Sequence, residues 1–136
     1  KGAIMKGAYS SIEMVQKAGL KIGLASSSPM SLIEAVIEKM NLKNTFSSLA
    51  SAEYLPYGKP NPQVFINCAI ELNSHPTQCL CVEDSFNGMI AAKAARMKCL
   101  VVPHPEQYMQ DRWNIADKKL SSLAQWNIET LNALIQ

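Results

Sequence analysis

Short apolar runs of strand length alternate along this chain with segments of helical periodicity, and this alternation restricts the possible folds more than any other feature. The run at residues 21–25 is broken by serines and a proline, and apolar residues then recur every three or four positions over residues 31–40. The run at residues 79–82 is likewise followed by a polar loop and a helical segment from about residue 87 to 96. This repeated order predicts right-handed crossovers and a mostly parallel sheet with helices on both faces.

The remaining segments fit the same plan. Asn61 followed by Pro62 is the pattern of a helix N-cap with proline at the first helical position, and an apolar stripe continues to Leu72. We predict further helices at about 7–18 and from 128 onward, further strands at 46–52 and 98–103, and a short element at 120–126. The expected fold class is therefore α/β, with one doubly wound, Rossmann-like domain over residues 1–136.

The composition argues against several classes of partner. Thirteen basic and eleven acidic residues leave a formal charge of +2, and the lysines are scattered along the chain. This pattern favours neither a nucleic-acid surface nor a membrane surface. No apolar run approaches the roughly 18 residues that a membrane span requires. A soluble, cytoplasmic protein fits these features.

The cysteines favour a reduced protein without a zinc site. There are four of them with no C-x-x-C pair, and both histidines lie outside any Cys/His cluster. Cys79 and Cys81 are two residues apart, which places both on one face of a strand and predicts buried, inert thiols.

Three groups of polar residues follow predicted strands or precede predicted helices. They are Ser26, Ser27 and Ser28; Lys59; and Glu83 with Asp84. In open α/β sheets, ligands bind beyond the carboxyl ends of the strands, so we expect these groups to lie at one site.

Their chemistry suits a phosphate beside a metal ion. Serine hydroxyls and the backbone N–H groups at a helix start hold phosphate oxygens, and a lysine neutralises charge that develops on a transferring phosphoryl group. Adjacent carboxylates such as Glu83 and Asp84 repel each other, and Mg²⁺, which prefers oxygen ligands, would remove that repulsion.

Each group also has a simpler interpretation. The three serines could form an ordinary polar loop, Lys59 could be a solvated surface lysine, and Asp84 with Ser85 could cap the next helix and leave Glu83 exposed. The order of the groups, each at a strand's carboxyl end, favours the phosphate site.

The same residues resemble the haloacid dehalogenase superfamily of Mg²⁺-dependent phosphatases. G-L-A-S-S-S-P resembles its second motif with Ser26 as the phosphate-binding hydroxyl, G-K-P-N-P its third with Lys59, and V-E-D-S-F-N-G-M its fourth with Glu83 and Asp84 at the metal. We also assign Asn87, in the fourth motif, to phosphate or substrate binding. The segments around Lys59 and Asp84 are most similar to the sugar-phosphate phosphatases, including those acting on 2-deoxyglucose 6-phosphate and on hexitol phosphates.

The resemblance implies nucleophilic catalysis on a small phosphorylated sugar or polyol. In this family an aspartate attacks phosphorus, a second aspartate two residues later protonates the leaving oxygen, and water hydrolyses the aspartyl-phosphate. Both belong to a D-x-D-G motif on the family's first strand. Residues 1–136 contain only Asp84, Asp111 and Asp117, and none stands in such a motif. The small helical cap that selects the sugar in this family has no counterpart either.

In the family, the first strand lies between the strands that here end at Ser26 and Glu83. Without it, those strands would leave unpaired edges that favour association. We hypothesise that this chain is the C-terminal part of a longer polypeptide. If it is complete, we predict no phosphatase activity and self-association through the exposed edge.

Two other functions remain open. One is a catalytically inactive module that keeps Ser26, Lys59, Glu83 and Asp84 and binds phosphate or a phosphorylated partner. The other is a response-regulator-like domain that acts through protein contacts, which ranks last because the acidic cluster such domains carry on early strands is absent.

Overall fold

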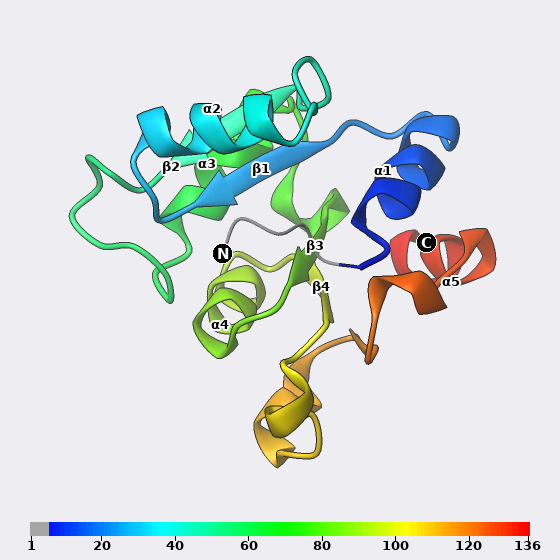
Figure 1. The fold of residues 1–136 in the computed structure, drawn as a ribbon. Coiled ribbons are helices and arrows are strands. Elements are labelled where there is room, and N and C mark those ends of the chain that lie inside the picture. The colour runs from blue at the N-terminus through cyan, green and yellow to red at the C-terminus, as the bar shows by residue number, and fades with distance from the viewer. Residues whose placement is uncertain (1–5) are drawn as a thin grey trace.

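A computed structural model of the chain describes residues 6–136, which form five α-helices and five strands (Figure 1). In chain order these are α1 (Ala8–Lys17), β1 (Gly23–Ser26), α2 (Met30–Lys39), β2 (Ser48–Ser51), α3 (Gln63–Glu71), β3 (Leu80–Glu83), α4 (Phe86–Ala94), β4 (Lys98–Val101), β5 (Lys118–Lys119) and α5 (Ile128–Ile135). The predicted α/β class is confirmed. Within residues 6–136, no helix combines the length and the apolar character needed to cross a bilayer.

All strand pairs are parallel, but they form two sheets where one was predicted. β1 pairs with β2 in one sheet, and the order β3-β4-β5 makes the other. Among the residues that the structure describes, nothing pairs with the second edge of β1 or of β3. The division falls at the position where the family resemblance expects another strand.

Helix α3 joins the two sheets through side-chain packing. It lies against β1 and β2, while its residues Phe65 and Ala69 share a buried cluster with Cys81 of β3 and Met89 of α4. Ala25 of β1 packs against the same cluster. The apolar core therefore continues across the gap in backbone pairing.

Several local predictions are confirmed and others need correction. The Asn61 side chain accepts a hydrogen bond from the Gln63 N–H at 2.9 Å, as expected near a helix start, but α3 begins at Gln63 with Pro62 at its N-cap, one residue later than predicted. The strand predicted at 46–52 is shorter, and the element at 120–126 is a 3₁₀ turn at Leu123–Gln125. β5 was not predicted, because its two lysines have no strand pattern and only pairing with β4 defines it.

The cysteines match the prediction in part. Cys81 is buried, Cys79 is half-buried, and all four cysteines are free thiols. A hydrogen bond with the Cys99 thiol, together with burial, holds the pKa of Cys81 well above its usual range. A thiol that stays protonated is a poor nucleophile, so this side chain serves as core.

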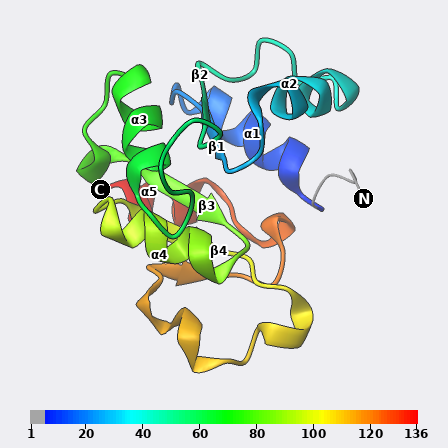
Figure 2. The ribbon, with the colours of Figure 1, turned by 90° about the vertical axis from the view of Figure 1, so that its left-hand side faces the viewer.

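The segment between β4 and β5 extends away from both sheets (Figure 2) and is anchored where it returns. Trp113 is buried and its indole N–H donates to the Gln107 carbonyl at 2.8 Å. Asp117 accepts hydrogen bonds from the Lys93 ammonium and from the Cys99 N–H, both at 2.7 Å. These contacts fix the start of β5 against β4.

We expect Asp117→Asn to destabilise the fold by about 1 kcal/mol at pH 7, the scale of one charge-assisted hydrogen bond at a partly exposed site. Burial raises the pKa of Asp117, but the bonds from Lys93 and Cys99 outweigh it, so the net pKa is lowered. A lowered pKa stabilises the fold above the unfolded value of about 3.9. The difference between wild type and variant should therefore shrink as the pH falls below about 4. Urea unfolding across pH tests this; a pH-independent difference would contradict it.

Candidate functional site

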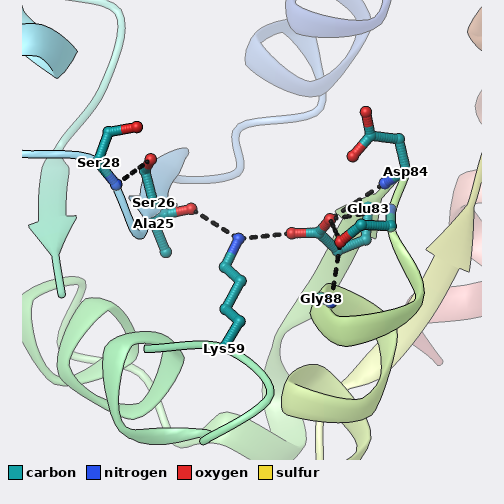
Figure 3. Close-up of polar contacts among 8 residues, drawn as sticks. Ala25, Ser26, Ser28, Lys59, Glu83, Asp84 and Gly88 are labelled. Carbon is teal, nitrogen blue, oxygen red and sulfur yellow. Dashed lines mark hydrogen bonds and ion pairs between the residues drawn. The ribbon is translucent and has the colours of Figure 1, made fainter. Parts of the chain in front are cut away.

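Lys59 lies between the ends of the two sheets and connects them (Figure 3). Its ammonium donates to the carbonyl of Ala25 on β1 at 3.2 Å and to Oε2 of Glu83 on β3 at 2.6 Å. The ammonium nitrogen also lies over the Phe65 ring, 4.7 Å from its centroid. The structure therefore brings together two of the three predicted polar groups and holds the lysine in one place.

Glu83 is the most highly coordinated side chain of the site. Its Oε1 accepts hydrogen bonds from the N–H groups of Asp84 and Ser85 at 3.1 and 3.3 Å, and from the Ser85 hydroxyl at 3.2 Å. Its side chain is only 10% exposed. The alternative in which Glu83 is an exposed neighbour of a helix cap is therefore wrong. Its charge is balanced by Lys59 and by the positive end of α4.

Ser85 caps α4, as one interpretation of the sequence proposed. Its hydroxyl oxygen accepts the Gly88 N–H at 3.0 Å while its own proton is donated to Glu83. Helix α4 accordingly begins at Phe86, immediately after the cap.

Asp84 occupies a different environment from its neighbour. It is exposed as a residue, and Figure 3 shows its carboxylate pointing away from the Lys59–Glu83 pair. Partial burial of the carboxyl group, and next the charge of Glu83, raise the pKa of Asp84. Within residues 6–136, no set of three or more acidic, histidine or cysteine side chains has a metal-binding arrangement.

The serine loop, Ser26 to Ser28, begins at the last residue of β1, and hydrogen bonds fix it and the start of α2. The Ser28 N–H donates to the Ser26 hydroxyl oxygen at 3.0 Å, so the Ser26 proton stays available for a ligand. The Met30 N–H, at the start of α2, donates to Glu53 Oε1 at 3.0 Å. The predicted supply of free backbone N–H groups is thus smaller than expected, because Ser28 and Met30 already have partners.

The loop that carries Lys59 lies against the serine loop. A Cβ added to Gly58 would be 3.1 Å from the Ser27 hydroxyl oxygen, which shows how closely the two loops approach. Asn87 is exposed on the first turn of α4, and its binding role stays a prediction.

Three contributors to the site were not predicted from the sequence: the Ala25 carbonyl, Glu53 and the Phe65 ring. A backbone carbonyl carries no sequence signal, and Phe65 had only the pattern of a core residue. Glu53 follows β2 and reaches the start of α2 only in the tertiary structure.

The comparisons with known proteins identify the family of this chain. The haloacid dehalogenase-like hydrolase family model matches residues 1–96. This chain belongs to the haloacid dehalogenase-like hydrolases, as its motifs predicted. It is 45% identical over 128 residues to hexitol phosphatase B of Escherichia coli K12, an alignment that covers 94% of this chain and 58% of that protein.

Solved structures give the same result. β-Phosphoglucomutase from Clostridium difficile matches with a TM-score of 0.83 and 26% identity, covering 97% of this chain and 56% of the other. CbbY from Rhodobacter sphaeroides, solved with xylulose-1,5-bisphosphate, matches with a TM-score of 0.80 and 26% identity over 89% of this chain and 55% of the other. The chain thus spans somewhat more than half the length of each relative.

Removing the Glu83 carboxylate should destabilise the fold strongly. In Glu83→Ala, the Lys59 ammonium keeps only the Ala25 carbonyl as a partner. The Lys59 side chain is only 15% exposed, so water cannot fully replace the lost carboxylate. Loss of one partner of a buried pair costs about 3 kcal/mol. Urea unfolding measures this cost, and adding Lys59→Met should recover part of it.

Glu13→Ala provides the matched control. Glu13 pairs with Lys17 at 3.5 Å on a surface where the two side chains are 66% and 77% exposed, so its removal should have little effect. Equal losses for Glu13→Ala and Glu83→Ala would contradict the structural role of the Lys59–Glu83 pair.

Proposed function

We propose that this chain forms the phosphate-binding and metal-binding part of a phosphatase that acts on a small sugar or polyol phosphate. One observation carries the proposal: Lys59 is fixed between β1 and β3 at the carboxyl edge of the strands, through the carbonyl of Ala25, the residue before Ser26, and the carboxylate of Glu83. The 45% identity to hexitol phosphatase B supports the substrate class.

The hydrogen-bonding capacity of the site fits a phosphoryl group. A lysine ammonium has three protons, and two of those on Lys59 point to Ala25 and Glu83, which leaves one for a phosphoryl oxygen. The Ser26 hydroxyl proton can bind a second oxygen. Lys59 would thereby balance negative charge on the phosphoryl group during transfer.

Asp84 is the better of the two candidate ligands for Mg²⁺. Its carboxylate points away from the ion pair, whereas both oxygens of Glu83 already accept hydrogen bonds. Glu83 Oε2 has one remaining lone pair, which allows it to act as a second ligand. When bound, Mg²⁺ would supply further positive charge to the phosphate oxygens and keep several water ligands.

The proposed reaction needs an aspartate nucleophile from outside residues 1–136. Its carboxylate would form a bond to phosphorus as the bond to the sugar oxygen breaks, and that oxygen would take a proton from the second aspartate of the D-x-D-G motif that the family resemblance implies. Water would then cleave the aspartyl-phosphate and release inorganic phosphate. The proposal includes a cytoplasmic location, which the four free cysteines support because thiols persist in reducing compartments.

A catalytically inactive phosphate-binding module is the second candidate. The observation that favours it is that the fixed Lys59 ammonium and the Ser26 hydroxyl proton could bind phosphate by themselves, without a nucleophile. Phosphate binding by calorimetry, without any phosphate release by the whole protein, would select this function over the phosphatase.

Activity of the whole protein tests the main proposal. With Mg²⁺ and a hexitol phosphate, Lys59→Ala and Asp84→Asn should each lower kcat/KM about 100-fold or more. Lys59→Ala removes positive charge that stabilises the transition state, and Asp84→Asn removes a carboxylate that would hold Mg²⁺. Asp84→Asn should also raise the Mg²⁺ concentration needed for half-maximal rate, whereas Lys59→Ala should not.

The matched controls are Lys43→Ala and Asp111→Asn, which change exposed residues of the same charge away from the site. Both should keep the wild-type rate. Unchanged rates in Lys59→Ala and Asp84→Asn would reject the site.

We also propose that residues 1–136, prepared alone, self-associate through the open strand edges. Neither β1 nor β3 has a second neighbour among the described residues, and Val82 of β3 is 42% exposed. Sedimentation should show an average mass that rises with protein concentration. Val82→Lys should reduce this self-association, because a charge on an edge strand opposes pairing with another chain. A monomer at all concentrations would refute this proposal.

A further inference from the structure

Gly88 lies in the first turn of α4, where nothing in the local backbone requires a glycine. Glycine is less favourable than alanine inside a helix by about 1 kcal/mol. The positive-φ glycines of the described chain are Gly7 and Gly19, so Gly88 does not need glycine's backbone freedom. Although Asn-Gly is a common turn signal, here it is helical.

Close approach to Glu83 explains the glycine. A Cβ at position 88 would lie 2.0 Å from the Glu83 carboxyl carbon and 2.2 Å from its Oε1. Real Cβ atoms essentially never show such contacts, so any side chain here would displace the carboxylate.

The carboxylate cannot move without loss, because it is held from both sides. Oε1 accepts from Asp84 and Ser85, and Oε2 accepts from Lys59 at 2.6 Å. Gly88 also donates its own N–H to the Ser85 hydroxyl that contacts Oε1. A displaced Glu83 would therefore release Lys59.

We propose that Gly88 is a positioning residue for Lys59. Because Gly88 has no side chain, the Glu83 carboxylate can lie against the first turn of α4. From there the carboxylate holds Lys59 where a phosphoryl group binds. This inference rests on the proposed function of Lys59. It assigns to Gly88 an effect on turnover that a glycine required only for helix packing would not have.

The first test is a double-mutant cycle on stability, which does not depend on activity. Gly88→Ala should lower the urea midpoint by about 0.5 M or more. It should have little effect in a Glu83→Ala background, because the Glu83 carboxylate that clashes with the new methyl group is absent there. If Gly88→Ala does not fold, the double variant should regain folding relative to it. Ala94→Gly, at an exposed position of α4, controls for helix propensity and should have the same effect in both backgrounds. Equal effects of Gly88→Ala in both backgrounds would overturn the inference.

The second test measures turnover by the whole protein on a hexitol phosphate. At saturating Mg²⁺, where a displaced Glu83 does not limit metal binding, Gly88→Ala should lower kcat/KM about 30-fold or more by itself. In a Lys59→Ala background it should lower kcat/KM less than about threefold, because the lysine that Gly88 positions is absent. A Gly88→Ala enzyme with wild-type turnover, beside an impaired Lys59→Ala enzyme, would overturn the inference and leave the proposed function intact. Full activity in both variants would refute the proposed function, and this inference with it.

Discussion

The ammonium of Lys59, held between the Ala25 carbonyl and the Glu83 carboxylate, is the contact on which the rest of the site depends. It joins two sheets that share no strand pairing among the described residues. Packing through α3 brings the sheets together, but packing is non-directional and does not fix the position of a polar group. The ion pair supplies that direction, because its two acceptors lie at the ends of β1 and β3.

The start of α4 is built around the same carboxylate. Ser85 satisfies the Gly88 N–H and donates to Glu83, and the missing side chain at Gly88 leaves room for both. Two adjacent acidic residues thereby acquire different environments. Glu83 is enclosed and neutralised by Lys59, whereas the carboxylate of Asp84 points away from the pair.

Much of this arrangement could be predicted from residue order. The alternation of strands and helices indicated that Lys59 and Glu83 would meet, since parallel strands place their carboxyl ends at one edge. The division into two sheets is consistent with the strand that the family resemblance placed between β1 and β3. The sequence could not show that some of the backbone N–H groups predicted to be free already have partners. The Met30 N–H, for example, donates to Glu53, which belongs to a loop distant in the sequence.

The sequence alone determined the α/β class, the family and the identity of the polar groups at the strand ends, because periodicity and motif order are local properties of the chain. Only the tertiary structure decided which carboxylate is enclosed and which is free. It also revealed why position 88 is a glycine. Those facts depend on distances between atoms of β3, α4 and the Lys59 loop, and such distances exist only after the elements have packed.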